Sequence, residues 1–229
     1  MSDLPVPELD GPVPLFPLPN AVLFPRAVLP LHIFEPRYRA MVGDALGSEH
    51  LIAIALLHPG HENLHRTNKA PISPVTCVGR ILNHEELEDG KYNIILQGLC
   101  RARIRQEHAD GTYREAFMER MVSREPETDS MHRTLREHLH GSISSDAFRD
   151  IALTEKLKTL LSTELPLGAV TDLVAYAIVQ DVEVKQSLLE QLDVVERVEQ
   201  LVAEIETLGR LIDLTRRTRG QWPPQTTQN

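Results

Sequence analysis

The chain has 229 residues, 41% of them hydrophobic, which is enough to bury a core in one or two domains. Acidic residues outnumber basic ones 33 to 24, and the formal net charge of -9 disfavours binding to nucleic acid or to anionic lipid. The acidic N-terminus and the absence of a long apolar run predict neither a secretion signal nor a membrane span, so we expect a cytoplasmic protein.

Residues 13 to 33 combine many prolines with side chains typical of strands. Proline cannot donate a hydrogen bond to a strand ladder, so this stretch predicts short edge strands joined by tight turns. Pro36 suits the first position of a helix, and apolar residues at helical spacing continue to Leu46. We expect Gly47 to end this helix in the left-handed conformation.

The run LIAIALL, residues 51 to 57, predicts a strand buried on both faces at the centre of a sheet. Three more strand patterns follow within residues 76–122, separated by turn signals at Asp89-Gly90 and Asp110-Gly111. About six strands and one helix, without regular alternation, predict an α+β fold. Its first domain, residues 1–122, is expected to be a small closed or half-closed β-barrel.

Residues 123–220 show only helical spacing and predict a second, helical bundle domain. Short helices are expected at 129–140, 146–164, 169–180 and 182–192, with a break at Gly141. Asp193 then caps a long final helix, whose apolar residues repeat every three or four positions: Val194, Val198, Leu201, Ile205, Leu208 and Ile212. This seam fits either packing within the bundle or a weak homodimer. Residues 221–229 are expected to be a disordered tail.

The segment HENLH, residues 61–65, matches the H-x-x-x-H spacing of a zinc site with Glu62 as the base. Pro59 and Gly60 precede it, and no apolar stripe holds a helix there, so a surface loop is favoured. A metal-dependent hydrolase stays an alternative. Phosphate-binding, dinucleotide-binding and nucleophile-elbow motifs are absent from the sequence, so we expect no catalytic residue, no cofactor and no resident metal.

Two further patterns concern single side chains. Arg101, Arg103 and Arg105 alternate along one predicted strand, which suggests either a phosphate-binding stripe or a solvated face paired with acids. The negative net charge favours the solvated face. His32 lies in an apolar run and is expected in the core. Cys77 and Cys100 are expected to be buried thiols.

Several segments together resemble the N-terminal substrate-binding domain of ATP-dependent Lon protease. They are PLFPLPNAVLFP, LPLHIFEPRYRAMV, VGRI, DGKYNIILQGLCRARI and EVKQSLLEQLDVVERVEQL, in this order within residues 13–212. The resemblance implies a PUA-like β-barrel followed by a helical bundle that helps to recognise unfolded or tagged substrates. The ATPase and peptidase modules have no counterpart in the sequence. The resemblance therefore indicates a stand-alone member of the group rather than a peptidase.

These observations predict a non-catalytic module that recognises protein or peptide. An unfolded or extended polypeptide would pair with the edges of the proline-rich strands, and a separate ATPase or protease is a further expected partner. The candidate contact residues are Phe24, Leu31, Phe34 and Tyr38. The alternatives are the metal-dependent hydrolase and an adaptor that assembles through its C-terminal helix, and the expected state is a monomer or a weak homodimer.

Overall fold

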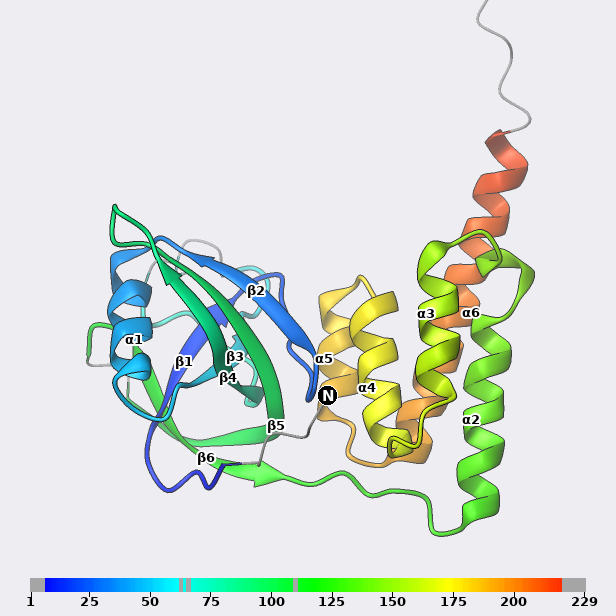
Figure 1. The fold of residues 1–229 in the computed structure, drawn as a ribbon, viewed down its shortest axis with the longest axis horizontal. Coiled ribbons are helices and arrows are strands. Elements are labelled where there is room, and N and C mark those ends of the chain that lie inside the picture. The colour runs from blue at the N-terminus through cyan, green and yellow to red at the C-terminus, as the bar shows by residue number, and fades with distance from the viewer. Residues whose placement is uncertain (1–6, 62–63, 65–66, 109–110, 220–229) are drawn as a thin grey trace, which may run out of the picture.

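The computed structural model describes residues 7–61, 64, 67–108 and 111–219. The strands and one helix form one side of the molecule and the other helices form a bundle beside it (Figure 1). The first side contains β1 (Val13–Leu18), β2 (Val28–Ile33), α1 (Pro36–Leu46), β3 (Leu51–Leu56), β4 (Val75–Glu86), β5 (Tyr92–His108) and β6 (Arg114–Met121). The bundle contains α2 (Asp129–Ile143), the 3-10 helix η2 (Asp146–Phe148), α3 (Ala152–Leu161), α4 (Leu167–Ile178), α5 (Val182–Glu190) and α6 (Val194–Arg219).

The six strands form one mixed sheet in the order β2-β5-β4-β3-β1-β6. An additional pairing between β5 and β6 closes a circuit of strands. This closure depends on the length of β5, whose 17 residues pair with β2 in the first part and with β6 in the second. The predicted α+β class is confirmed, and β3 is fully buried within the sheet as its continuous apolar sequence indicates.

The two proline-rich strands occupy different places in the sheet. β2 lies at the end of the strand order with β5 as its neighbour, as predicted for an edge strand. β1 pairs in parallel with β3, and it pairs with β6 only over Val13–Leu15. The prediction of an edge strand is therefore wrong for the first half of β1. Residues 16–18 have one strand neighbour only, which explains how this strand accommodates Pro17.

Two of the predicted turn and helix signals are confirmed, and a third, at Gly47, is wrong; Asp110 of the predicted Asp110-Gly111 turn lies outside the described residues. Gly90 has a φ of 73° in the turn between β4 and β5, as the Asp89-Gly90 pair indicates. Pro36 begins α1, as predicted. Gly47 has a φ of -78°, however, because its N–H group donates back to the carbonyls of the last helical turn. The left-handed residue is instead His50, at φ 62°, directly before β3.

Helix boundaries in the bundle differ from the sequence prediction at two places. α2 continues through Gly141 to Ile143, because a glycine inside a helix costs only about 1 kcal/mol and does not by itself end the helix. The helix predicted at 146–164 is divided into η2 and α3, and the Thr154 hydroxyl donates to the carbonyl of Phe148 at 2.8 Å across the division. Thr128 caps α2 by accepting a hydrogen bond from the backbone N–H of Met131.

The apolar seam of α6 faces its own bundle. Val194, Val198, Leu201 and Ile205 have no exposed surface, and α6 packs against α2 and α4. Leu208 and Ile212 are partly buried against the same core. The seam is therefore used within the chain, which removes the main argument for assembly through these residues. Leu211 and Leu214 near the end of α6 are exposed.

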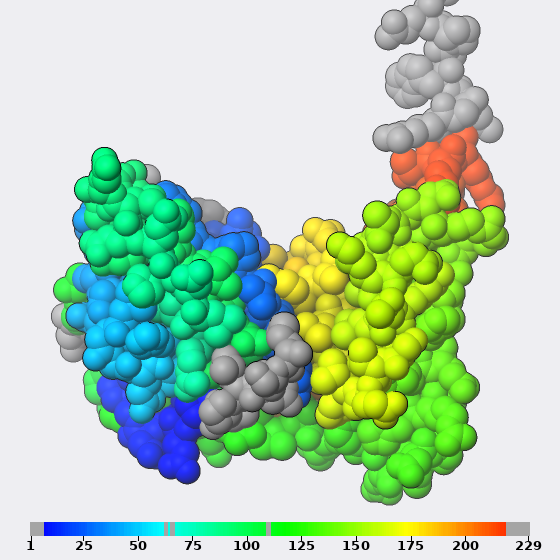
Figure 2. Space-filling view, in the orientation of Figure 1, coloured from blue at the N-terminus to red at the C-terminus, as the bar shows by residue number. Residues whose placement is uncertain are grey.

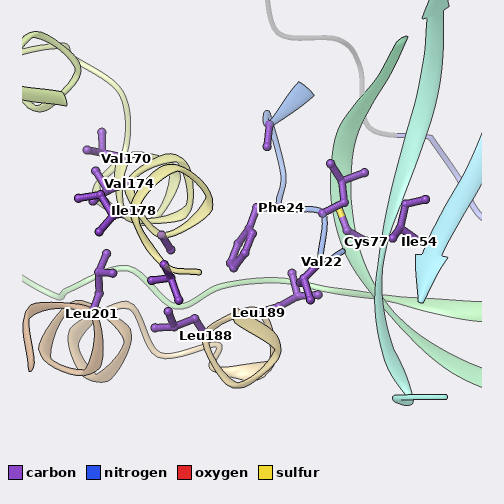
Figure 3. Packing of buried hydrophobic residues seen from close by; sticks show 14 of the residues in the cluster. Val22, Phe24, Ile54, Cys77, Val170, Val174, Ile178, Leu188, Leu189 and Leu201 are labelled. Atoms are coloured by element: carbon purple, nitrogen blue, oxygen red, sulfur yellow. The ribbon is translucent and has the colours of Figure 1, made fainter. Parts of the chain in front are cut away.

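The strands and the bundle share one continuous apolar core, with Phe24 at their junction. Figure 3 shows Phe24 between the strands that carry Cys77 and Ile54 and the helices that carry Ile178 and Leu188. All of these side chains are at least nine-tenths buried. Burial raises the pKa of the Cys77 thiol well above its usual value, as expected for the predicted buried cysteine. The second cysteine, Cys100, is also buried.

A buried cluster of charges crosses the same junction. Arg101 of β5 donates two hydrogen bonds to the Asp172 carboxylate of α4, at 2.7 and 2.6 Å, and a third to the carbonyl of Leu189 at 2.8 Å. Arg197 of α6 lies 3.4 Å from the same carboxylate. The prediction of a solvated face is therefore wrong for Arg101, whose side chain is 3% exposed, but Arg105 does pair with Glu119 at the surface.

The carboxylate is needed to keep two buried cations in place. Arg197 has no exposed surface, and burial lowers its pKa to about 10, so the group stays charged at neutral pH. Its guanidinium also donates to the carbonyl of Gln191 at 2.8 Å and to the hydroxyl of Ser123 at 3.2 Å. Ser123 belongs to the connection between β6 and α2, where the boundary predicted between residues 122 and 123 falls. The cluster thus ties this connection to both parts of the molecule.

Candidate peptide-binding groove

An apolar groove opens where β1, β2 and β3 end and α1 begins. Its volume is about 320 Å³. Its walls include six large apolar side chains from these four elements and the residues that follow them: Phe16, Leu18, Leu31, Ile33, Tyr38 and Leu57. A groove of this size and lining fits one or two apolar side chains of a bound chain.

Three of the four residues predicted from the sequence line this one groove. Tyr38 is buried, Leu31 is half-buried, and Phe34 is 59% exposed. The structure does not place Phe24 with them: its side chain has no exposed surface and lies at the junction with the bundle. We therefore assign Phe24 to packing between the two parts of the molecule. The convergence of the other three was not visible in the sequence pattern.

One wall of the groove is held rigid by contacts of Tyr38. Its ring centroid lies 4.4 Å from that of Phe16, and the Arg37 guanidinium lies over the ring at 4.4 Å. Arg37 in turn pairs with Glu35 at 3.1 Å. Burial raises the pKa of the Tyr38 hydroxyl, so the phenol stays neutral around pH 7. The wall thus presents a neutral, fixed aromatic surface beside one ion pair.

The rim is formed by the end of β2. Phe34 stacks on His32, with 6.2 Å between the ring centroids. His32 is exposed, so its predicted place in the core is wrong; the alternation along β2 turns it away from the buried residue Ile33. Its Nδ1 lies 2.8 Å from Oδ1 of Asn93, and the Asn93 amide donates to Glu85 at 3.0 Å. These hydrogen bonds orient the rim before any ligand arrives.

The helical bundle reaches the other end of β2. The Tyr176 hydroxyl of α4 donates to the carbonyl of Val28 at 3.0 Å, and Lys185 of α5 lies over the Tyr176 ring at 5.1 Å. Figure 2 shows the molecular surface hollowed between the strand side and the bundle, above α4 and α5. The start of β2 is therefore in contact with the bundle through the Val28 carbonyl, whereas its end leads into the groove.

The HENLH segment is only partly within the described residues. Glu62 and His65 lie outside them, while His61 holds its Nδ1 3.1 Å from the carbonyl of Pro59. In the part of the chain that the structure describes, no three His, Cys, Asp or Glu side chains gather as a metal site would require. Among the same residues, no helix combines the length and the apolar character needed to cross a bilayer.

A metal measurement tests the hydrolase alternative. We expect protein purified without an affinity tag to contain far less than one zinc per chain, because a proline-glycine turn directly precedes His61 and does not support the helix that such a site needs. Elemental analysis by mass spectrometry gives the content. Stoichiometric zinc that is lost in a His65→Ala variant would instead establish a metal site in this loop.

The fold is shared with solved Lon domains. A Lon N-terminal domain protein from Xanthomonas campestris has a TM-score of 0.60 and 22% sequence identity, covering 84% of this chain and 98% of that one. The N-terminal domain of the Mycobacterium avium complex Lon protease also has a TM-score of 0.60, with 20% identity over 85% of this chain and 98% of that one. The architecture is therefore that of a Lon N-terminal domain.

The sequence comparison gives the family. Residues 12–207 match the model of the ATP-dependent protease La (LON) substrate-binding domain, and the chain belongs to this family. Lon protease 2 of Sorangium cellulosum is 29% identical over 220 residues, covering 93% of this chain and 26% of that protein. The Lon protease of Desulfosudis oleivorans is 25% identical over 203 residues. The chain thus spans about a quarter of the length of these relatives.

Proposed function

We propose that this chain binds an extended, unfolded stretch of polypeptide in the groove between β1, β2 and α1, and that it performs no catalysis. The observation that carries this proposal is the convergence of Leu31, Phe34 and Tyr38 on an apolar groove beside the end of an edge strand. Strand edges bind peptides through main-chain hydrogen bonds, and neighbouring pockets take alternate side chains. The family's description as a substrate-binding domain supports the same function.

The proposal also includes where and with what the chain works. A separate ATPase or protease would receive the bound polypeptide, and the cytoplasm, where unfolded chains arise during synthesis, is the proposed location. The protease activity in the names of the longer relatives is a property of those proteins, of which this chain spans about a quarter. The groove is lined mainly by apolar side chains, so it is suited to holding a chain rather than to cutting one.

The proposal predicts that Phe34→Ala weakens polypeptide binding by roughly 5- to 10-fold, since truncating an aromatic contact commonly costs more than about 1 kcal/mol. The side chain is 59% exposed, so its loss is expected to leave the fold intact. Fluorescence anisotropy with labelled, reduced and carboxymethylated α-lactalbumin measures the affinity.

A matched control is Phe117→Ala. Phe117 is 38% exposed on β6 and lies outside the groove. Its truncation also removes an exposed phenylalanine ring, and it is expected to leave the affinity within about twofold of the original. Equal weakening in both variants, or no binding of the unfolded chain by the folded wild type, would remove the support for this site.

A further inference from the structure

The pairing of β2 with β5 determines which of its backbone groups face outward. The N–H of Gly98 donates to the carbonyl of Ala27 at 2.9 Å, next to the start of β2. Hydrogen-bonded pairs in an antiparallel ladder recur at every second residue. The backbone groups that bond to β5 are therefore those of Leu29, Leu31 and Ile33.

The intervening residues of β2 point their backbone groups to the open edge. These are Val28, Pro30 and His32, and the Tyr176 hydrogen bond to the carbonyl of Val28 agrees with this assignment. Pro30 offers a carbonyl there and no N–H group. His32 offers both groups, directly at the rim of the groove.

Across the groove, the last part of β1 presents a second open edge. The N–H of Leu57 donates to the carbonyl of Leu18 at 2.9 Å, so Leu18 faces β3 and Pro17 faces the other way. No residue of β6 is paired with Pro17, because the β6 pairing ends at Leu15. Pro17 and the following Pro19 both line the groove, and neither has an N–H group.

The two edges therefore carry an unequal set of hydrogen-bonding groups. Within the described residues, Pro17 and Pro30 contribute a carbonyl acceptor and no N–H group, and His32 contributes both groups. Val28 contributes only its N–H group, because its carbonyl already accepts from Tyr176. Buried carbonyls need partners, so a ligand that fills the groove must bring donors. Two such edges from different copies pair poorly, because the proline positions supply no N–H donors.

On the basis of the proposed function, we infer that the groove selects extended polypeptides by their backbone N–H groups. A bound segment donates at alternate positions to the open carbonyls of β2, those of Pro30 and His32, and its apolar side chains lie against Tyr38 and Leu31. Segments with proline at the donating positions are excluded. The prolines of β1 and β2 thus serve recognition of the ligand backbone as well as protection of the edges.

An N-methyl scan tests this inference. Overlapping 13-residue peptides covering α-lactalbumin are screened by anisotropy, and the tightest binder is synthesised with one N-methyl amide at each position in turn. We expect methylation at two or three alternate positions to weaken binding by about 5- to 30-fold, because an acceptor of the groove loses its partner there. Methylation at the positions between them is expected to change the affinity by less than twofold.

The outcomes separate the two levels of the proposal. If none of the peptides binds the folded protein, the proposed function fails. If a peptide binds and N-methylation has a uniform effect or none, the selection by backbone donors is wrong while peptide binding stands. If the wild type forms a dimer that the peptide dissociates, a second copy of the chain occupies the groove. The excess of carbonyl acceptors over N–H donors would then not explain what the groove binds.

A substitution in the protein gives an independent measurement. Pro30→Ala adds an N–H donor to the open edge of β2, and we expect it to raise self-association in sedimentation velocity, because the edge gains the group needed for strand pairing. Pro25→Ala, in the turn before β2, is the control and is expected to leave the sedimentation coefficient unchanged. Equal behaviour of the two variants, with both folded by circular dichroism, would count against the role given to Pro30.

Discussion

Replacing Asp172 with alanine is expected to lower the free energy of unfolding by about 3–5 kcal/mol. The Asp172 carboxylate accepts two hydrogen bonds from Arg101 and lies 3.4 Å from Arg197, and both arginine side chains are almost completely buried. Its removal leaves two cations without their counter-charge in a region that water does not reach. Urea denaturation followed by circular dichroism measures the change, with an unaltered slope as the sign of an unaltered native state.

The matched control for this prediction is Glu119→Ala. Glu119 pairs with Arg105, which lies on β5 as Arg101 does. Unlike the residues of the buried cluster, both of these side chains are more than half exposed. Its loss is expected to cost less than about 1 kcal/mol, because solvent screens such pairs. Similar losses of unfolding free energy in the two variants would mean that the buried cluster stabilises the protein no more than the surface pair does.

A triple substitution distinguishes an unpaired charge from lost packing. Changing Arg101 to Met, Asp172 to Leu and Arg197 to Met removes all three charges together. We expect this variant to recover most of the stability that Asp172→Ala loses, since apolar side chains can replace buried ion clusters at little cost. Stability as low as in the single variant would indicate that the hydrogen bonds to Leu189 and Gln191 carry the effect.

The second large effect is expected at Gly98, where alanine should destabilise the protein by about 3 kcal/mol or more. A Cβ atom at this position would lie 2.1 Å from the carbonyl oxygen of Phe24 and 2.8 Å from its carbonyl carbon. A flexible side chain could rotate away from the new methyl group, but the Phe24 carbonyl can only move together with the whole segment before β2. Phe24 would then leave its place between the strands and the bundle.

Gly43→Ala is the control for this substitution. Gly43 lies within α1, and nothing comes within 4 Å of a Cβ atom added there. Alanine in a helix interior is favoured over glycine by about 0.8–1 kcal/mol, so a small gain in stability is expected. Thermal and urea unfolding of both variants give the comparison, and a loss at Gly43 equal to that at Gly98 would contradict the steric explanation.

Local sequence patterns were sufficient to predict the order of the helices and strands along the chain. The run 51–57, the Asp89-Gly90 turn and the change to helical spacing after residue 122 each reflect a preference of neighbouring residues, and the structure shows the corresponding strand, turn and bundle. The error at Gly47 is of another kind. Glycine permits the left-handed conformation without requiring it. The N–H of Gly47 donates to carbonyls of the last turn of α1, and the left-handed residue is His50.

The contacts between distant segments could not be predicted in the same way. Alternation along β5 puts Arg101 on one side of the strand, but only the fold brings Asp172 to that side, 71 residues away in sequence. The groove has the same character, because its walls come from the ends of three strands and the start of α1. Its apolar residues were proposed singly, and their grouping depends on how β1 and β2 lie in the sheet.

The anchoring of α6 has a mechanical consequence. This helix has 26 residues, so at about 1.5 Å per residue it is about 39 Å long. Its first turn carries Arg197, which meets the strand side through a shared carboxylate. Because α6 is one continuous helix whose first turn is tied to β5 through Asp172, we expect a sideways force on its far end to reach β5 and the strand β2 that borders the groove.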